Sequence, residues 1–188
     1  MTKSERSLSK DLKKAASILK SGGIVIFPTD TVYGIGCRFD DSKAIDKLYL
    51  IKKTPVDQNF PILVSDINQV NKLAKVTQVA EKLISKYWPG ALTIVLESLD
   101  GLTKLGFRMP DSNLVKSLIA EVGVPIIGTS ANFSGQTSPK TYEELDPEFM
   151  KLAGFVIKGG CQKGIESTVV DATFDPPKII RQGVVKLD

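Results

Sequence analysis

The sequence contains no histidine and only two cysteines among its 188 residues. Without imidazole, the protein has no histidine to act as a catalytic base, a proton shuttle or a metal ligand. Cys37 and Cys161 are far apart and form no CxxC pair, which argues against a zinc site or a disulfide framework. Oxygen ligands for a hard cation are still available.

Long apolar runs are also missing. The longest are of strand length, far short of the roughly 20 residues that a membrane-spanning helix needs. Residues 1–20 are charged and amphipathic rather than signal-like, so we expect a cytoplasmic protein. With 42% hydrophobic residues and no linker-like stretch, we expect one domain over residues 1–188. The net charge of +4 suits an anionic substrate or nucleic acid without deciding between them.

The most informative segment is residues 22–36, GGIVIFPTDTVYGIG. Its apolar run, Ile24 to Phe27, predicts a buried strand whose ladder ends at Pro28, because proline has no N–H to donate. Hydroxyls and a carboxylate follow in residues 29–33. Ligands of open α/β sheets bind at such strand ends, although an ordinary turn has the same composition.

Periodicity and breaker residues predict the remaining elements. Expected helices are 7–21, 42–53 with Ser42 as N-cap, 67–75, 77–87, 113–122 after the cap Ser112, and one opened by a Thr141–Glu144 capping box. Expected strands are 24–27, 61–64, 91–97, 105–109, 124–128, 155–158, 168–172 and 178–181. This order predicts an α/β domain with a twisted, mixed, partly antiparallel sheet and helices on its faces.

Three polar clusters end strands or open loops, namely residues 29–33, 130–138 and 166–168. The cations Lys52, Arg108 and Arg181 each lie beside an apolar segment. Together they predict a concave cationic site for a phosphate or carboxylate ligand, although each cation taken alone is typical of a solvated surface charge. Neither G-x-x-x-x-G-K-[ST] nor G-x-G-x-x-G occurs, so any ATP would bind without a phosphate loop.

These segments closely resemble the YrdC-like family, the threonylcarbamoyl-AMP synthases, over nearly the whole chain. The motifs that carry the resemblance are residues 28–34 (PTDTVYG), 88–93 (WPGALT), 108–110 (RMP), 130–135 (SANFSG), 166–170 (ESTVV) and 180–183 (IRQG). The chain resembles the short form, without the extra C-terminal domain of longer members.

The resemblance implies an enzyme, a nucleotidyltransferase that joins L-threonine, bicarbonate and ATP, with Mg²⁺, into threonylcarbamoyl-AMP and pyrophosphate. Partner proteins would then transfer the group to tRNA. By similarity, Lys52 would be catalytic and would bind ATP together with Ser130, Asn132, Ser138 and Arg181. Threonine would contact Thr29, Arg108 and Ser167. The metal ligands are not implied.

One position departs from the family pattern. The family usually has Lys-x-Arg where this chain reads Lys52-Lys53-Thr54, which removes a bidentate donor to phosphate or carboxylate. A paralogue that binds structured RNA without synthase activity is therefore the main alternative. A carbamoyl-transfer module of hydrogenase-maturation type is less favoured, because the zinc-finger cysteines of those longer chains are missing.

Overall fold

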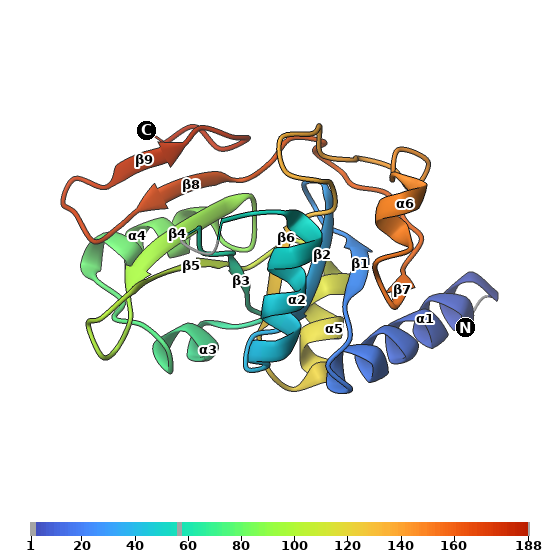
Figure 1. Ribbon diagram of the computed structural model, residues 1–188. Helices are drawn as coiled ribbons and strands as arrows, with labels where there is room; N and C mark the ends of the chain where they lie inside the picture. The colour runs from blue at the N-terminus through green and yellow to red at the C-terminus, as the bar shows by residue number, and fades with distance from the viewer. Residues whose placement is uncertain (1–2, 56–57, 188) are drawn as a thin grey trace.

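The computed structural model describes residues 3–55 and 58–187 (Figure 1). The helices in this part of the chain are α1 (Lys3–Lys20), α2 (Ser42–Lys52), α3 (Ile67–Asn71), α4 (Gln78–Tyr87), α5 (Asn113–Val122) and α6 (Pro147–Met150). The strands are β1 (Val25–Pro28), β2 (Tyr33–Arg38), β3 (Ile62–Leu63), β4 (Leu92–Glu97), β5 (Lys104–Arg108), β6 (Ile126–Ser130), β7 (Phe155–Val156), β8 (Thr168–Asp171) and β9 (Lys178–Arg181).

The strands of the described residues form one sheet in the order β7-β1-β2-β6-β3-β5-β4-β8-β9. The β1–β7, β3–β5 and β4–β8 pairs are parallel, and the other neighbours are antiparallel. This sheet confirms the predicted α/β fold with a mixed, partly antiparallel sheet. The assignment of all 188 residues to one domain stays a prediction.

Helices cover both faces of the sheet, and Figure 1 shows α2 in front of the strands and α5 behind them. The smaller core cluster joins α1 and α5 to β1 and β6, with Leu19, Phe27 and Leu118 fully buried. The larger cluster joins α2 and α4 to the rest of the sheet through residues such as Leu48 and Phe107. Because both faces are covered, strand β1 is buried throughout, as its apolar run predicts.

The local pattern does not predict strand β2 (Tyr33–Arg38), because its alternating glycines are typical of a turn. The chain instead turns at residues 29–32 and returns as β2, antiparallel to β1. Tyr33, Ile35 and Cys37 alternate with glycines and are completely buried. A Cβ on Gly36 would overlap the carbonyl oxygen of Ile127 on β6, so close strand approach explains the glycine there.

Strand β6 is also longer at its C-terminal end than the apolar run suggests. The apolar run predicts an end at Gly128, but Thr129 and Ser130 are still paired with Ile35 and Gly34 of β2. The polar residues therefore lie in the sheet rather than after it, and the main-chain ladder fixes their positions.

Two helix caps differ from expectation, whereas Ser112 caps α5 as predicted. Asp41 rather than Ser42 caps α2, with its carboxylate accepting from the amide of Ala44. No helix begins at Thr141, because the Glu144 carboxylate accepts from the amide of Lys140 within a turn. The short helix α6 starts later, at Pro147, capped by Asp146.

Candidate functional site

Two adjoining hollows lie where β1, β5 and β6 end and β4 begins. The first, the inner pocket, has a volume of about 100 Å³, and the second, the outer groove, has about 660 Å³. Both are lined by Pro61, Thr93, Thr129, Ser130, Glu166 and Arg181, so they form one continuous depression. The volume of the outer groove falls in the range typical of small-molecule sites.

Arg108 forms the base of the inner pocket. Its Nε donates to the carbonyl of Gly90 (3.0 Å), its Nη1 donates to the Thr31 hydroxyl (2.9 Å), and its Nη2 forms an ion pair with Asp30 (2.5 Å). The Asp30 side chain is fully buried, and that of Arg108 is only 8% exposed. Desolvation lowers the pKa of Arg108, and the Asp30 carboxylate opposes that shift. The guanidinium is therefore held rigidly with its charge toward the pocket.

The turn at residues 29–32 supplies the pocket wall through hydroxyls that also hold the turn together. Thr29 Oγ1 donates to the carbonyl of Val32 (2.8 Å) and accepts from the amide of Thr31 (3.0 Å). Tyr33 follows, fully buried, with its hydroxyl donating to the carbonyl of Gly159 (2.7 Å). Burial raises the pKa of Tyr33 to about 12, so it stays a neutral donor.

Lys52 ends α2 beneath the outer groove and is almost fully buried. Its Nζ donates to the carbonyls of Ser130 (2.6 Å) and Asn132 (2.5 Å) and to the Asn132 side-chain oxygen (3.3 Å). Burial lowers the pKa of Lys52 to about 8, and the Glu166 carboxylate partly opposes that shift. Lys52 thus orders the segment 130–132 and places a positive charge behind it.

Arg181 on the edge strand β9 stands where the two hollows join. Its Nη1 pairs with Glu166 (2.9 Å), and its Nη2 donates to the carbonyl of Ser167 (2.9 Å). The other carboxylate oxygen of Glu166 accepts from the hydroxyl of Ser138. The hydroxyls of Ser167 and Thr93 are 2.9 Å apart and buried at the mouth of the pocket.

The structure brings most of the predicted site residues together. Thr29, Arg108 and Ser167 line the inner pocket, Lys52 and Asn132 line the outer groove, and Ser130 and Arg181 line both. Ser138 lines neither hollow and reaches the site only through Glu166. The individual roles of these residues stay predictions. The cationic character of the site also stays a prediction, because Asp30 pairs with Arg108 and Glu166 pairs with Arg181.

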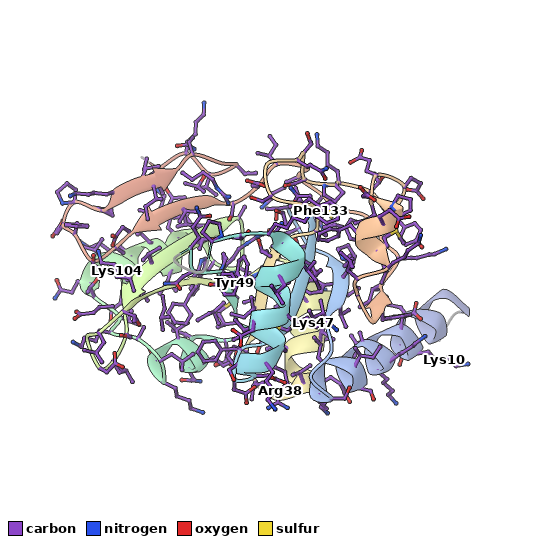
Figure 2. All side chains as sticks on the ribbon, viewed as in Figure 1. Lys10, Arg38, Lys47, Tyr49, Lys104 and Phe133 are labelled. Atoms are coloured by element: carbon purple, nitrogen blue, oxygen red, sulfur yellow. The ribbon has the colours of Figure 1, made fainter. Side chains whose placement is uncertain are left out.

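The sequence predicts Thr31 and Glu166 only as members of polar clusters, without individual roles, and gives Thr93 no site role, although all three line the inner pocket. Each lies inside a quoted motif, so the motifs carried the signal without showing which side chains point inward. Lys104 was also missed. It lines the outer groove while paired with Asp171 (2.8 Å). Figure 2 labels Lys104 at the left of the molecule and Phe133 near the upper end of α2.

The described residues do not fit a magnesium site held by the protein alone. Among residues 3–55 and 58–187, no group of three or more His, Cys, Asp or Glu side chains is arranged around a common point. The groove carboxylates, Glu166 and Asp171, are already paired with Arg181 and Lys104. Because Mg²⁺ commonly uses one or two carboxylates plus substrate phosphates, a nucleotide would have to supply most of its ligands.

Comparison with known proteins identifies the family. Residues 17–183 match the Sua5/YciO/YrdC family, which carries the description "Telomere recombination". The chain belongs to this family. The match covers almost all of the described residues, including every residue of the inner pocket and the outer groove.

Individual relatives agree with this assignment. A Bacillus subtilis protein named threonylcarbamoyl-AMP synthase is 36% identical over 92% of this chain and 53% of its own. The structure of Pyrococcus abyssi Sua5 complexed with L-threonine has a TM-score of 0.87, with 35% identity over 92% of this chain and 54% of that one. This chain therefore spans about half the length of these two relatives.

A shorter relative is closer in length. The crystal structure of Escherichia coli YciO has a TM-score of 0.84, with 26% identity over 93% of this chain and 90% of that one. The Escherichia coli protein is itself named uncharacterized. In the part of this chain that the structure describes, no helix has the length and apolar character required to cross a membrane.

Proposed function

We propose that this protein is an L-threonylcarbamoyladenylate synthase, a nucleotidyltransferase that forms threonylcarbamoyl-AMP and pyrophosphate from L-threonine, bicarbonate and ATP. One observation carries the proposal. A small polar pocket based on the buried Arg108 opens directly into a groove large enough for a nucleotide, in a family whose Pyrococcus member was solved with L-threonine. Two substrates bound in this way would lie end to end.

The chemistry requires that arrangement. The amine of threonine and bicarbonate form a carbamate and release water. A carbamate oxygen then attacks the α-phosphorus of ATP, and the bond to the leaving pyrophosphate breaks. Because both reactants are anions, the protein must screen their repulsion and align them. No covalent enzyme intermediate is needed, which suits a chain without histidine.

Arg108 is well placed to bind the threonine carboxylate. Three of the five N–H groups of a guanidinium are used by Gly90, Thr31 and Asp30, which leaves two for a ligand in the pocket. The buried hydroxyls of Thr93 and Ser167 offer further contacts to the amino acid.

The nucleotide would lie in the outer groove. Lys52 holds the segment 130–132 with its polar groups along the groove, and its positive charge behind that segment would attract the phosphates. Arg181, at the junction of the two hollows, would contact the phosphate that reacts with the carbamate. Magnesium bound to ATP would screen the triphosphate charge. The product would pass to tRNA-modifying partner proteins in the cytoplasm.

The names of the Bacillus and Pyrococcus relatives support the synthase over an RNA-binding paralogue. The polar residues of the inner pocket also suit a small ligand, because Thr93, Ser167 and Arg108 are buried rather than displayed on a surface. Nucleic-acid contacts would instead require exposed cations and aromatic side chains. Direct RNA binding stays a prediction.

The test measures pyrophosphate release by the purified protein with ATP, L-threonine and bicarbonate together, and with each omitted in turn. We expect release only when all three are present, and we expect Arg108→Lys to raise the KM for threonine more than the KM for ATP. The matched control is Lys151→Arg, a change in an exposed ion pair with Glu148 outside both hollows. Release that is independent of threonine would contradict the proposal.

A further inference from the structure

Glu166 occupies the junction of the inner pocket and the outer groove with both carboxylate oxygens engaged. One oxygen pairs with Arg181 Nη1 at 2.9 Å, and the other accepts from the Ser138 hydroxyl. The Glu166 and Arg181 side chains are 37% and 47% exposed, so a ligand can reach this ion pair. The carboxylate therefore lies among donors that face an open site.

A carboxylate and a phosphate compete for such donors. Both accept charge-assisted hydrogen bonds from a guanidinium, commonly in a bidentate arrangement, and both accept a hydrogen bond from a hydroxyl group. A phosphate that takes the Arg181 Nη1 and Ser138 donors would therefore replace Glu166, and a polyanion in the groove would repel the carboxylate as well. The guanidinium stays in place during this exchange, because the carbonyl of Ser167 holds its other arm at 2.9 Å.

The backbone around Glu166 is fixed, so the exchange involves the side chain alone. The Glu166 carbonyl accepts from the amide of Val184 at 3.1 Å. Gly183 packs so closely on residues 166 and 167 that a Cβ there would overlap their carbonyl groups. A displaced Glu166 carboxylate thus rotates about a fixed Cα, and the inner pocket is the other hollow that this residue lines.

We propose that Glu166 is an exchangeable counter-ion that couples the two substrates. In the free protein it neutralises Arg181. When a nucleotide phosphate takes its place, the carboxylate turns to the inner pocket and binds the amino group of the amino acid. This inference rests on the proposed function and adds a positioning role to it.

The consequence is a reciprocal coupling between two ligands. If the phosphate frees Glu166 for the amino group, AMP tightens the binding of threonine, and threonine must tighten the binding of AMP by the same factor. We expect a factor of about ten, which is within the usual range for coupled sites. Without the carboxylate the coupling is lost, although both ligands still bind.

The experiment is isothermal titration calorimetry at fixed salt, with L-threonine titrated in the absence and presence of saturating AMP. In Glu166→Gln we expect AMP alone to bind about threefold to fivefold more tightly, because an amide competes less than an ion pair. In the same variant, we expect AMP to tighten the binding of threonine by less than about twofold. The matched control, Glu148→Gln, removes the same charge from an exposed pair with Lys151 and should behave as wild type.

Each outcome is decisive. Coupling and AMP affinity in Glu166→Gln that equal those of the wild type would overturn the counter-ion role and leave the proposed function standing. A wild type that binds neither ligand would overturn both. If Glu166→Gln does not fold, Glu166→Asp keeps the charge but is too short to reach Ser138 and Arg181 together, so its coupling should be weaker than that of the wild type. Unchanged coupling in that variant would also overturn the proposal.

Discussion

Replacing Arg108 with methionine should destabilise the protein strongly, because it leaves a charge without its partner in the interior. The Asp30 side chain has no exposed surface, and its nearest other cation is Lys163 at 3.7 Å. One carboxylate oxygen, Oδ2, has no hydrogen-bond partner even with Arg108 present. Removing one partner of a buried ion pair typically costs about 3–5 kcal/mol. Since domains are usually stable by about 5–15 kcal/mol, the variant should still fold at low temperature.

A double-mutant cycle separates the ion pair from the other bonds of Arg108. In Asp30→Asn the carboxylate charge is gone, so a further Arg108→Met change leaves no unpaired charge at positions 30 and 108. We expect the double variant to be about 1–3 kcal/mol more stable than the sum of the single effects predicts. The same cycle on the exposed pair Arg38–Asp40 serves as a control and should give less than about 1 kcal/mol.

The assay is urea unfolding followed by tryptophan fluorescence. Trp88 is the single tryptophan of the sequence, and its indole N–H donates to the carbonyl of Leu92 at 2.7 Å, so its signal reports the packing beside the pocket. Single effects of Asp30→Asn and Arg108→Met that add to within about 0.5 kcal/mol would refute the argument that these two charges depend on each other.

Three further predictions concern single residues. Burial lowers the pKa of Lys52 to about 8, so the affinity for ATP measured by calorimetry should fall about tenfold from pH ~7 to ~9 as the ammonium loses its proton. The affinity of Lys52→Arg should change little over this range, and a flat wild-type profile would contradict the prediction. Thr54 lines the outer groove, so Thr54→Arg should tighten ATP binding about tenfold through a charge-assisted bond, and an unchanged dissociation constant would show that Arg is not needed there. Gly36→Ala should lower the free energy of unfolding by about 3 kcal/mol, because the new Cβ would overlap the Ile127 carbonyl. Gly160→Ala, where the new Cβ would meet open space, should leave the stability unchanged. Equal urea midpoints for the two variants would count against this prediction.

The sequence predicts the layers of this fold better than its connections. The apolar runs 24–27 and 91–97 agree to within one residue with the strands β1, which is buried, and β4, which is mostly buried. Gly123 ends α5 in the left-handed conformation, as the local pattern indicates. The strand β2 escaped prediction because its alternate glycines resemble a turn. These glycines are needed because strand β6, residues 126–130, approaches β2 closely. That strand lies about 90 residues further along the chain, so a local sequence pattern cannot reveal the contact.

The site shows the same division. The motifs place Arg108 and Arg181 near polar loops, and the structure places both on the inner pocket. The sequence could not show that Lys52 binds the carbonyls of Ser130 and Asn132, because such long-range pairs depend on the packing of α2 against β2, the neighbour of β6 in the sheet. The engagement of Glu166 by Arg181 is likewise visible only in three dimensions.

The most direct test of the account follows the carbon of bicarbonate. The protein is incubated with ATP, L-threonine and ¹³C-labelled bicarbonate, and the adenylate is analysed by mass spectrometry. The account predicts a threonylcarbamoyl-AMP that carries the heavy carbon and is absent when threonine is omitted. An unlabelled threonyl-AMP, or no adenylate from a folded protein that binds ATP, would contradict it.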